Sequence, residues 1–343
     1  MSASRCELLL LALIVGCTPT DDPAPQEPLP RLDPEPDGPP PGLELYTTGD
    51  DSDVEAAPQG PILLAMGGGP EVDVAFERSF DELGVVGDVV VLRTSGSDGY
   101  NEYLYEDIGG VDSVQTMLVT SRALADDPWV GWRIRHAEVV WLAGGDQSTY
   151  VESWAGTETG AAIAHVWARG GLVGGTSAGA AVLGSVVFSA RLGGVGSGEA
   201  TEDPYHPRVT LDQDVFGFAG SSHALFDTHF QARDRMGRLV AFLARSMEDG
   251  LDAAPVGLGL DERTALQVGP DGIGEVFGAG AVHVVVPSER PQRCAPGEPL
   301  EFSGLARAAV RAGGTLDPGS GITDAATAPL AVRNGVLHPE DPY

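Results

Sequence analysis

From Pro61 onward, short apolar runs alternate with segments of helical periodicity. The first run, Ile62 to Met66, closes on three consecutive glycines at 67 to 69, and a helical stretch follows from about 72 to 83. Such alternation predicts an α/β fold: a mostly parallel sheet with helices on both faces, in three layers, whose ligands bind at the carboxyl ends of the strands. The other expected strands are Asp88 to Leu92, Val114 to Val119, Val139 to Ala143 and Leu172 to Gly174, and the other helical segments lie near 99 to 107, 121 to 126 and 157 to 168.

The later part of the chain shows shorter apolar runs, at 257 to 260, 265 to 268, 274 to 276 and 282 to 286. These runs predict strands and hairpins that complete the same sheet. Beyond Pro287 the content of Gly, Pro and Ala rises and no clear element can be assigned. The predicted folded domain therefore covers residues 59–287, and residues 288–343 are a C-terminal extension of uncertain structure.

The N-terminus has the pattern of an export signal. After Arg5, the apolar run Leu8 to Val15 is shorter than the ~20 residues that span a bilayer, which suits the apolar region of a signal peptide. The residues directly before Cys17 resemble the lipobox of bacterial lipoproteins, in which the cysteine becomes the acylated N-terminus; an ordinary signal peptide is the alternative. Because Thr18 and Pro19 lack the Asp of inner-membrane retention, we expect residues 1–17 to direct an outer-membrane lipoprotein, periplasmic or at the cell surface.

A proline-rich stretch follows the cysteine. Residues 18 to 42 contain ten prolines among several acids, and acidic residues continue without a packing pattern to about residue 58. Such spacing leaves no apolar periodicity. Residues 18–58 are therefore predicted to be an extended tether between the membrane and the folded domain.

Composition limits the partners. Hydrophobic residues make up 42% of the chain, enough for a sizeable core, and the formal charge is −30. All 20 basic residues are arginines. This balance supplies no basic surface for phosphates, so nucleic-acid binding is excluded. The three cysteines, Cys6, Cys17 and Cys294, provide neither a disulfide scaffold nor a Cys-rich zinc site.

The segment Gly174 to Ala180 reads GGTSAGA, where an expected strand ends and a helical run begins. Gly175, Ser177 and Gly179 have the GxSxG spacing of a nucleophile elbow, a tight turn that exposes a serine hydroxyl at a helix N-terminus. A glycine-rich turn that merely packs tightly, or that cradles a phosphate, has the same pattern.

A serine nucleophile needs a base, and histidine is the usual one. Of the seven histidines, His229 stands out in the sequence FDTHF, just before an arginine-rich helical segment. A satisfied core histidine is the plainer interpretation of one residue in such a setting. His283 and His338 fit structural positions, and the pattern leaves His136, His165, His206 and His223 open.

Four strings together resemble the cyanophycinase and dipeptidase E family of serine peptidases, in the family's order and over roughly residues 60 to 287. They are LAGGDQ at 142–147, GGTSAGAAVLG at 174–184, DTHF at 227–230 with arginines beyond it, and GLGLDERTAL at 257–266. The resemblance implies a flavodoxin-like fold of the class I glutamine amidotransferase type. It also implies a serine–histidine–carboxylate triad that needs no metal or other cofactor.

The resemblance assigns roles to individual residues. Ser177 would be the nucleophile, His229 the base and Glu262 the carboxylate, with Asp261 as its rival. The backbone N–H groups of Ala178 and Gly145 would form the oxyanion hole. Residues matching the family's substrate pocket are Gln147 and Asp227, for a substrate arginine, and Arg233, Arg235 and Arg238, for its aspartyl part; without the resemblance, these three arginines read as a salt-bridged helix surface. Thr228 departs from the family's DQH pattern, which bears on arginyl specificity.

The sequence thus predicts an exported, lipid-anchored serine exopeptidase of cyanophycinase type. Its substrate would be poly-aspartate with arginine side branches, released as β-aspartyl-arginine dipeptides. A dipeptidase for short aspartyl peptides and a non-catalytic surface binding protein on the same fold are the alternatives, and a homodimer is left open. A glutaminase is disfavoured because the elbow carries Ser rather than Cys.

Overall fold

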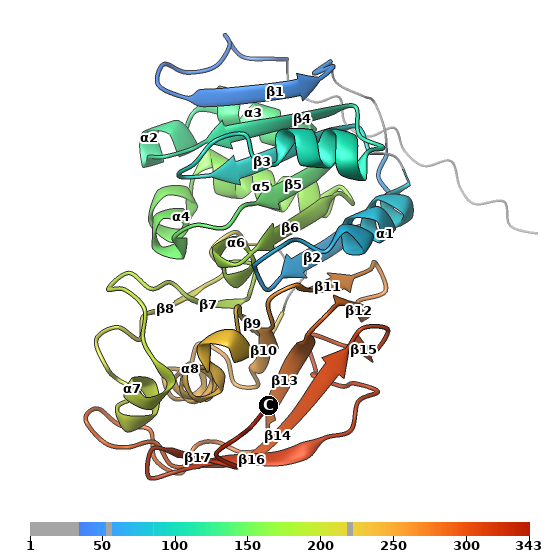
Figure 1. The fold of residues 1–343 in the computed structure, drawn as a ribbon. Helices are drawn as coiled ribbons and strands as arrows, with labels where there is room; N and C mark the ends of the chain where they lie inside the picture. The colour runs from blue at the N-terminus through green and yellow to red at the C-terminus, as the bar shows by residue number, and fades with distance from the viewer. Residues whose placement is uncertain (1–33, 53–56, 85, 218–221) are drawn as a thin grey trace, which may run out of the picture. The chain divides into compact units, whose positions relative to one another are not determined.

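The computed structural model describes residues 34–52, 57–84, 86–217 and 222–343 (Figure 1). The predicted signal peptide, with Cys17, and the first part of the tether lie outside the described residues. Within the described ranges, no helix is long and apolar enough to cross a membrane.

A nine-stranded sheet forms the larger part of the fold (Figure 1). Its five central strands are parallel and are flanked by antiparallel strands, so the predicted α/β class is confirmed, with a mixed sheet rather than a mostly parallel one. In spatial order the strands are β1 (Glu44–Gly49), β4 (Ser113–Leu118), β3 (Asp88–Arg93), β5 (Val139–Leu142), β6 (Leu172–Thr176), β2 (Ile62–Met66), β11 (Thr264–Val268), β12 (Gly274–Gly278) and β15 (Thr315–Leu316).

Alternating side chains of the central strands bury both faces of this sheet. In β2, Ile62, Leu64 and Met66 pack in one apolar cluster, with Phe76 and Phe80 of α1 (Asp73–Leu83). The intervening side chains of β2 pack in another cluster on the opposite face. Strands buried on both sides read as continuous apolar runs, which is why the sequence pattern located them.

Helices cover both faces of the nine-stranded sheet. The face of α1 also carries the π-helix η1 (Tyr103–Ile108). The other face is covered by α3 (Pro128–His136), α4 (Gln147–Trp154) and α5 (Glu158–Ala168), with the short α2 (Arg122–Ala125) beside them. Side-chain caps fix where these helices begin: Asp127, Asp146 and Thr157 each accept a backbone N–H of the first turn.

A second, six-stranded sheet was not predicted. Its order is β17 (Val336–His338), β16 (Ala328–Arg333), β14 (Phe302–Arg311), β13 (Ala281–Pro287), β10 (Val256–Leu260) and β9 (Ala224–Asp227). The runs at 257–260 and 282–286 belong here, so the expectation that they complete the first sheet was wrong; those at 265–268 and 274–276 do complete it. Periodicity identifies a strand but does not say which sheet it joins.

Apolar residues of α8 (Met236–Glu248) form a core with residues of the six-stranded sheet. The smaller elements nearby are α7 (Ser197–Glu202), the 3-10 helix η3 (Gln231–Arg233) and the two-stranded sheet of β7 (Val186–Phe188) and β8 (Leu211–Gln213). Residues 288–343, which had no clear element in the sequence, supply three strands of the second sheet and β15 of the first, and they are part of the folded domain. Phe302, Leu305 and Leu330 are buried in its core.

The predicted tether is shorter than expected. Residues 44–49 form β1, which pairs with β4 along six residues at the edge of the nine-stranded sheet. Gln115 of β4 donates to Thr47 at 3.2 Å. An antiparallel edge strand needs only one partner, so a short segment with little apolar periodicity suffices.

Candidate active site

Ser177 lies in the turn between β6 and α6 (Ala178–Ala181) with φ 52° and ψ −117°, in a region that non-glycine residues seldom occupy. Its backbone N–H donates to Met66 O of the neighbouring strand at 3.0 Å, which holds the turn in place. The turn needs small neighbours: a Cβ on Gly179 would lie 2.0 Å from Leu142 O. These features are those of a nucleophile elbow.

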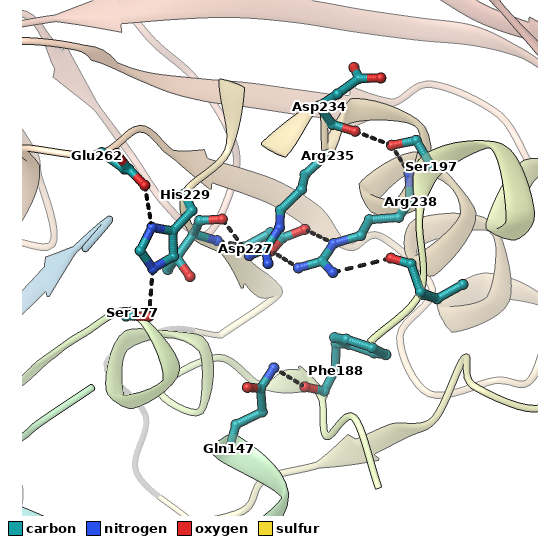
Figure 2. Close-up of polar contacts among 12 residues, drawn as sticks. Gln147, Ser177, Phe188, Ser197, Asp227, His229, Asp234, Arg235, Arg238 and Glu262 are labelled. Carbon is teal, nitrogen blue, oxygen red and sulfur yellow. Dashed lines mark hydrogen bonds and ion pairs between the residues drawn. The ribbon is translucent and has the colours of Figure 1, made fainter. Parts of the chain in front are cut away.

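The imidazole of His229 joins Ser177 to Glu262 (Figure 2). Ser177 Oγ lies 2.8 Å from His229 Nε2, and His229 Nδ1 lies 2.7 Å from Glu262 Oε1. Ser177 follows β6 of the first sheet, whereas His229 and Glu262 follow β9 and β10, parallel neighbours in the second. The structure therefore brings together the three residues that the resemblance assigned to a triad.

The surroundings of His229 suit a base at neutral pH. Burial lowers the pKa of His229 from 6.5, and the positive charges of Arg233 and Arg235 add to the effect, while the hydrogen bond to Glu262 opposes it. That bond lowers the pKa of Glu262, whose side chain is 40% exposed and remains ionised. At pH 7 the imidazole is neutral, with a proton on Nδ1 directed at the carboxylate and a lone pair on Nε2 directed at Ser177.

Asp261, the alternative carboxylate, is hydrogen-bonded to residues other than His229. It accepts the backbone N–H of Gln231 at 2.9 Å and of Ala281 at 3.1 Å, and it pairs with His283 Nε2 at 3.2 Å. The geometry therefore favours Glu262 as the partner of His229. Asp261 instead ties the segment after β9 to β13.

The two residues predicted for the oxyanion hole both line the pocket beside Ser177. Ala178 begins α6 directly after Ser177, and Gly145 lies in the turn between β5 and α4. A Cβ on Gly145 would meet Tyr150 Oη at 2.7 Å, so a larger residue here would displace the Tyr150 hydroxyl. The position is consistent with two backbone N–H groups facing one substrate oxygen.

A pocket of about 460 Å³ opens beside Ser177 and His229. Gln147 and Arg233 line it, and Gln147 Nε2 donates to Phe188 O at 3.4 Å on its far wall. Residues without a role in the sequence-based assignment also line it, among them Ser148, Phe188 and Arg191. Arg191 is held by Asp212 through Nη2 to Oδ1 at 2.6 Å. No motif marks these positions: Ser148 lies in α4, Phe188 ends β7 and Arg191 lies just beyond it.

Asp227, predicted to bind a substrate arginine, is already bound by two arginines of the chain (Figure 2). Arg238 Nε donates to Oδ2 at 2.7 Å and Arg238 Nη2 to Oδ1 at 2.5 Å, and Arg235 Nη1 approaches Oδ1 at 3.2 Å. The Asp227 and Arg238 side chains are 4% and 6% exposed. The carboxylate of Asp227 is therefore engaged in an internal ion pair, and its contact with a substrate arginine stays a prediction.

Arg235 and Arg238 are both largely buried, in different surroundings. Arg238 also donates to Val195 O and lies over the rings of Phe188 and Phe242. Burial lowers the pKa of Arg235 to about 10, with the cations of Arg238 and Arg233 contributing, so it stays charged at neutral pH. Asp227 thus holds two positive charges at the base of the pocket, and Arg233 adds a third on its wall.

Comparison with known proteins supports a peptidase. The sequence profile of Peptidase family S51 matches residues 99–202, which include Ser177. The chain is 29% identical over 238 residues to a cyanophycinase of Synechococcus elongatus, covering 66% of this chain and 69% of that protein. It is 30% identical over 188 residues to a cyanophycinase of Trichormus variabilis, covering 54% and 57%.

Among solved structures, a peptidase from an acI-B1 actinobacterium superimposes with a TM-score of 0.51 at 20% identity, covering 76% of this chain and 98% of that chain. At this identity the likeness concerns the fold. Together the fold and these sequence matches define a serine-type peptidase of the α/β class. The similarity to peptidase family S51 and to the cyanophycinases agrees with the resemblance of the four sequence motifs.

Replacing Glu262 with glutamine should separate its electrostatic role from its shape. Because the carboxylate raises the pKa of His229, its loss should move the acidic limb of the kcat/KM profile, which lies below pH 6.5, to still lower pH. Turnover at pH 8 should fall roughly 100-fold, since glutamine stabilises the imidazolium less well. Asp261→Asn is the control, and the acidic limb of its pH profile should coincide with that of the wild type. If Glu262→Gln also leaves the acidic limb at the wild-type pH, the assignment of Glu262 is contradicted.

Proposed function

We propose that the protein is a secreted serine exopeptidase of cyanophycinase type that acts through Ser177, His229 and Glu262. The observation that carries the proposal is the unbroken hydrogen-bond chain of these residues, ending at the strained elbow and opening into a cationic pocket. The proposed substrate is poly-aspartate with arginine side branches, and the proposed product is a β-aspartyl-arginine dipeptide.

The acylation step follows from the geometry. Ser177 Oγ attacks the scissile carbonyl carbon while His229 Nε2 accepts the hydroxyl proton, and the carbonyl oxygen becomes an oxyanion that the N–H groups of Ala178 and Gly145 stabilise. Glu262 keeps the Nδ1 proton of His229 in place and offsets the charge of the imidazolium. Collapse of the intermediate breaks the C–N bond, and His229 returns its proton to the leaving amine, which leaves an acyl ester on Ser177.

Water completes the cycle. It attacks the ester carbon as His229 removes one of its protons, and the C–O bond to Ser177 breaks as that proton returns to Oγ. The products are a free carboxylic acid and the original hydroxyl. Each residue ends in its starting protonation state, so no cofactor is required in the scheme.

The charge of the pocket supports an acidic substrate. Within a chain of net charge −30, the pocket beside Ser177 is lined by Arg191, Arg233, Arg235 and Arg238, against the carboxylates of Asp146 and Asp227. Since Arg235 and Arg238 share Asp227, Arg233 is the cation best placed to meet a substrate carboxylate. The two relatives named above are cyanophycinases, which supports a polyaspartyl substrate.

Product analysis tests the assignment. The purified chain beginning at residue 18, which keeps the edge strand β1, is incubated with insoluble cyanophycin and separately with β-aspartyl dipeptides, and the products are identified by mass. Release of β-aspartyl-arginine from the polymer is expected. Cleavage of the dipeptides alone would replace the proposal with a dipeptidase, and a chain that neither cleaves nor labels at Ser177 with a serine-reactive probe would be a binding protein.

Asp146 is the carboxylate that we expect to meet a substrate guanidinium. It lines the pocket, is exposed, and caps α4 through Oδ1, which accepts from Ser148 N at 3.0 Å. Asparagine caps a helix about as well as aspartate, so Asp146→Asn should spare the fold. The KM for arginyl substrates should rise about tenfold with kcat little changed, as expected for the loss of one charge-assisted contact. A KM increase of the same size for substrates with neutral side branches would contradict this role.

Anchoring through Cys17 is a separate part of the proposal. If the cysteine is acylated, Cys17→Ser expressed in a bacterium that exports lipoproteins should leave the membrane fraction, because the lipid supplies the whole anchor. Cys294→Ser, which alters a partly buried cysteine of the folded domain, serves as the control and should stay with the membrane. Fractionation followed by immunodetection gives the answer, and membrane association that survives Cys17→Ser would refute acylation there.

A further inference from the structure

We propose that Glu71 is a positioning residue for the nucleophile: its carboxylate lies behind the elbow, outside the pocket, and holds Thr176, so that Ser177 is presented to His229. The inference rests on the triad proposed above. Glu71 has no role in the sequence-based assignment, and it does not line the pocket. Any influence it has on catalysis must therefore act through its neighbours.

Glu71 ends a short turn that contacts His229 directly and adjoins the residues that hold Ser177 and the segment of Glu262. The turn, residues 67–71, joins β2 to α1. Gly67 O accepts the backbone N–H of His229 at 2.8 Å, and a Cβ on Gly68 would meet His229 Cε1 at 2.5 Å. Gly68 O accepts Arg263 N at 2.9 Å, and Met66, just before the turn, accepts the N–H of Ser177. A shift of this turn would therefore move Ser177, which follows the first sheet, and His229, which follows a strand of the second.

The Glu71 carboxyl group sits in a buried polar cluster on the α1 face of the sheet. Tyr100 Oη donates to Glu71 Oε1 at 2.5 Å. In strand β6, Thr176 has the same parity as Leu172, which packs in the cluster of α1 and Trp141, so Thr176 faces this side while Ser177 turns into the pocket. The Thr176 hydroxyl is close enough to Glu71 to lower the pKa of its carboxyl.

Three polar atoms of this cluster are buried and have no hydrogen-bond partner among the described residues: Glu71 Oε2, Thr176 Oγ1 and Trp141 Nε1. Two of them are donors and the third is a carboxylate oxygen. Buried donors and acceptors without partners are unfavourable. A small rotation of the Thr176 hydroxyl or of the Glu71 carboxyl group that brings the two into a hydrogen bond is therefore favoured. The ionised carboxylate can accept from the Thr176 hydroxyl, which would fix the residue that directly precedes Ser177.

The charges around Glu71 determine when it is ionised. Burial raises its pKa to about 7, and Asp73 at the start of α1 raises it further, whereas the hydrogen bond from Tyr100 and the nearby hydroxyl of Thr176 lower it. Tyr103 faces the same cluster, and burial holds the pKa of both tyrosines far above neutrality, so they remain protonated; Arg93 acts on Tyr100 from β3. Glu71 therefore loses its negative charge as the pH falls through about 7, and with it the ability to accept from Thr176.

The rate at which Ser177 reacts with a fluorophosphonate tests this role without any peptide substrate. In that reaction the Ser177 Oγ–P bond forms, fluoride leaves and His229 takes the hydroxyl proton. Glu71→Gln keeps the shape of the side chain and should slow labelling at pH 8 about tenfold, as a slightly misplaced nucleophile would. Glu77→Gln, the same change on the exposed face of α1, is the matched control and should label like the wild type.

The pH profile distinguishes positioning from a general loss of structure. Wild-type labelling should still rise between pH 6.5 and 7.5 as Glu71 ionises, whereas the Glu71→Gln curve should be flat there and show only the His229 step at lower pH. With an active substrate, kcat should fall and KM should stay within twofold, because Glu71 lies outside the pocket. Wild-type labelling rates and an unaltered pH curve in Glu71→Gln overturn the proposal.

A second pair of variants covers the case in which Glu71→Gln does not fold. Thr176→Val removes the hydroxyl and keeps the volume, and it should label slowly; Thr176→Ser restores the hydroxyl and should recover the wild-type rate. Equal rates for the two variants overturn the role of the hydroxyl. If the wild-type protein does not label, both the proposed triad and this inference are refuted. If it labels but does not cleave cyanophycin, only the substrate assignment is refuted.

Discussion

Ser177→Ala and His229→Ala should each reduce turnover by roughly 10³-fold or more, with the unfolding temperature almost unchanged. The first removes the attacking oxygen, and the second removes the base that lies 2.8 Å from it. Alanine occupies the strained backbone of residue 177 no better and no worse than serine, so the fold gains or loses little. Initial rates on the substrate identified above, together with thermal unfolding, measure both effects.

The double variant should be no worse than either single variant, because residues that act as one unit do not lose activity additively. Ser148→Ala is the matched control: it removes a hydroxyl from the same pocket, and its rate should stay within a few fold of the wild type. Full activity in Ser177→Ala would refute the serine mechanism. Additive losses in the double variant would show that Ser177 and His229 act independently.

Asp227→Ala should lower the free energy of unfolding by about 3–5 kcal/mol, because it leaves two buried guanidinium groups without their shared carboxylate. The effect is on folding rather than on substrate affinity, in contrast to the role that the sequence suggested. Denaturant-induced unfolding gives the value, provided the variant folds with one cooperative transition.

The Arg191–Asp212 pair offers the comparison that isolates burial. It has similar geometry, with Arg191 Nη2 at 2.6 Å from Asp212 Oδ1, but its side chains are 39% and 27% exposed. Asp212→Ala should therefore cost only about 0–1 kcal/mol. If both variants are equally stable, Asp227 is not the counter-ion of the buried arginines, and its contact with substrate has to be reconsidered.

The central strands could be predicted from sequence because both of their faces are buried. Val89 to Val91 and Val139 to Val140 form continuous apolar runs that admit one interpretation. The strands of residues 302–338 alternate buried and exposed side chains and are separated by glycine- and proline-rich turns, so they carry a weaker signal. Their assembly into a separate sheet depends on long-range pairing, which no local pattern records.

The active site, too, could be predicted from the sequence only in part. The elbow around Ser177 could be found from sequence because a tight turn imposes small residues at fixed spacing. The family resemblance supplied His229 and Glu262, which periodicity alone did not select. The internal ion pair of Asp227 could not be predicted, because a carboxylate and nearby arginines in the sequence do not say which pairs form in space. Arg238 lies 11 residues beyond Asp227 in the chain and yet binds it through two nitrogens.

Because the triad is divided between two sheets, the catalytic site forms late in folding. Ser177 is in place once the five parallel strands of the first sheet have formed. Its base and carboxylate arrive only when β9 and β10 have docked, and β10 is paired in turn with β13, and β13 with β14. A nascent chain that has emerged as far as the elbow carries an inert hydroxyl. Hydrolysis therefore begins only after nearly the whole domain has assembled, and the return of activity during refolding would time the last docking event rather than the first.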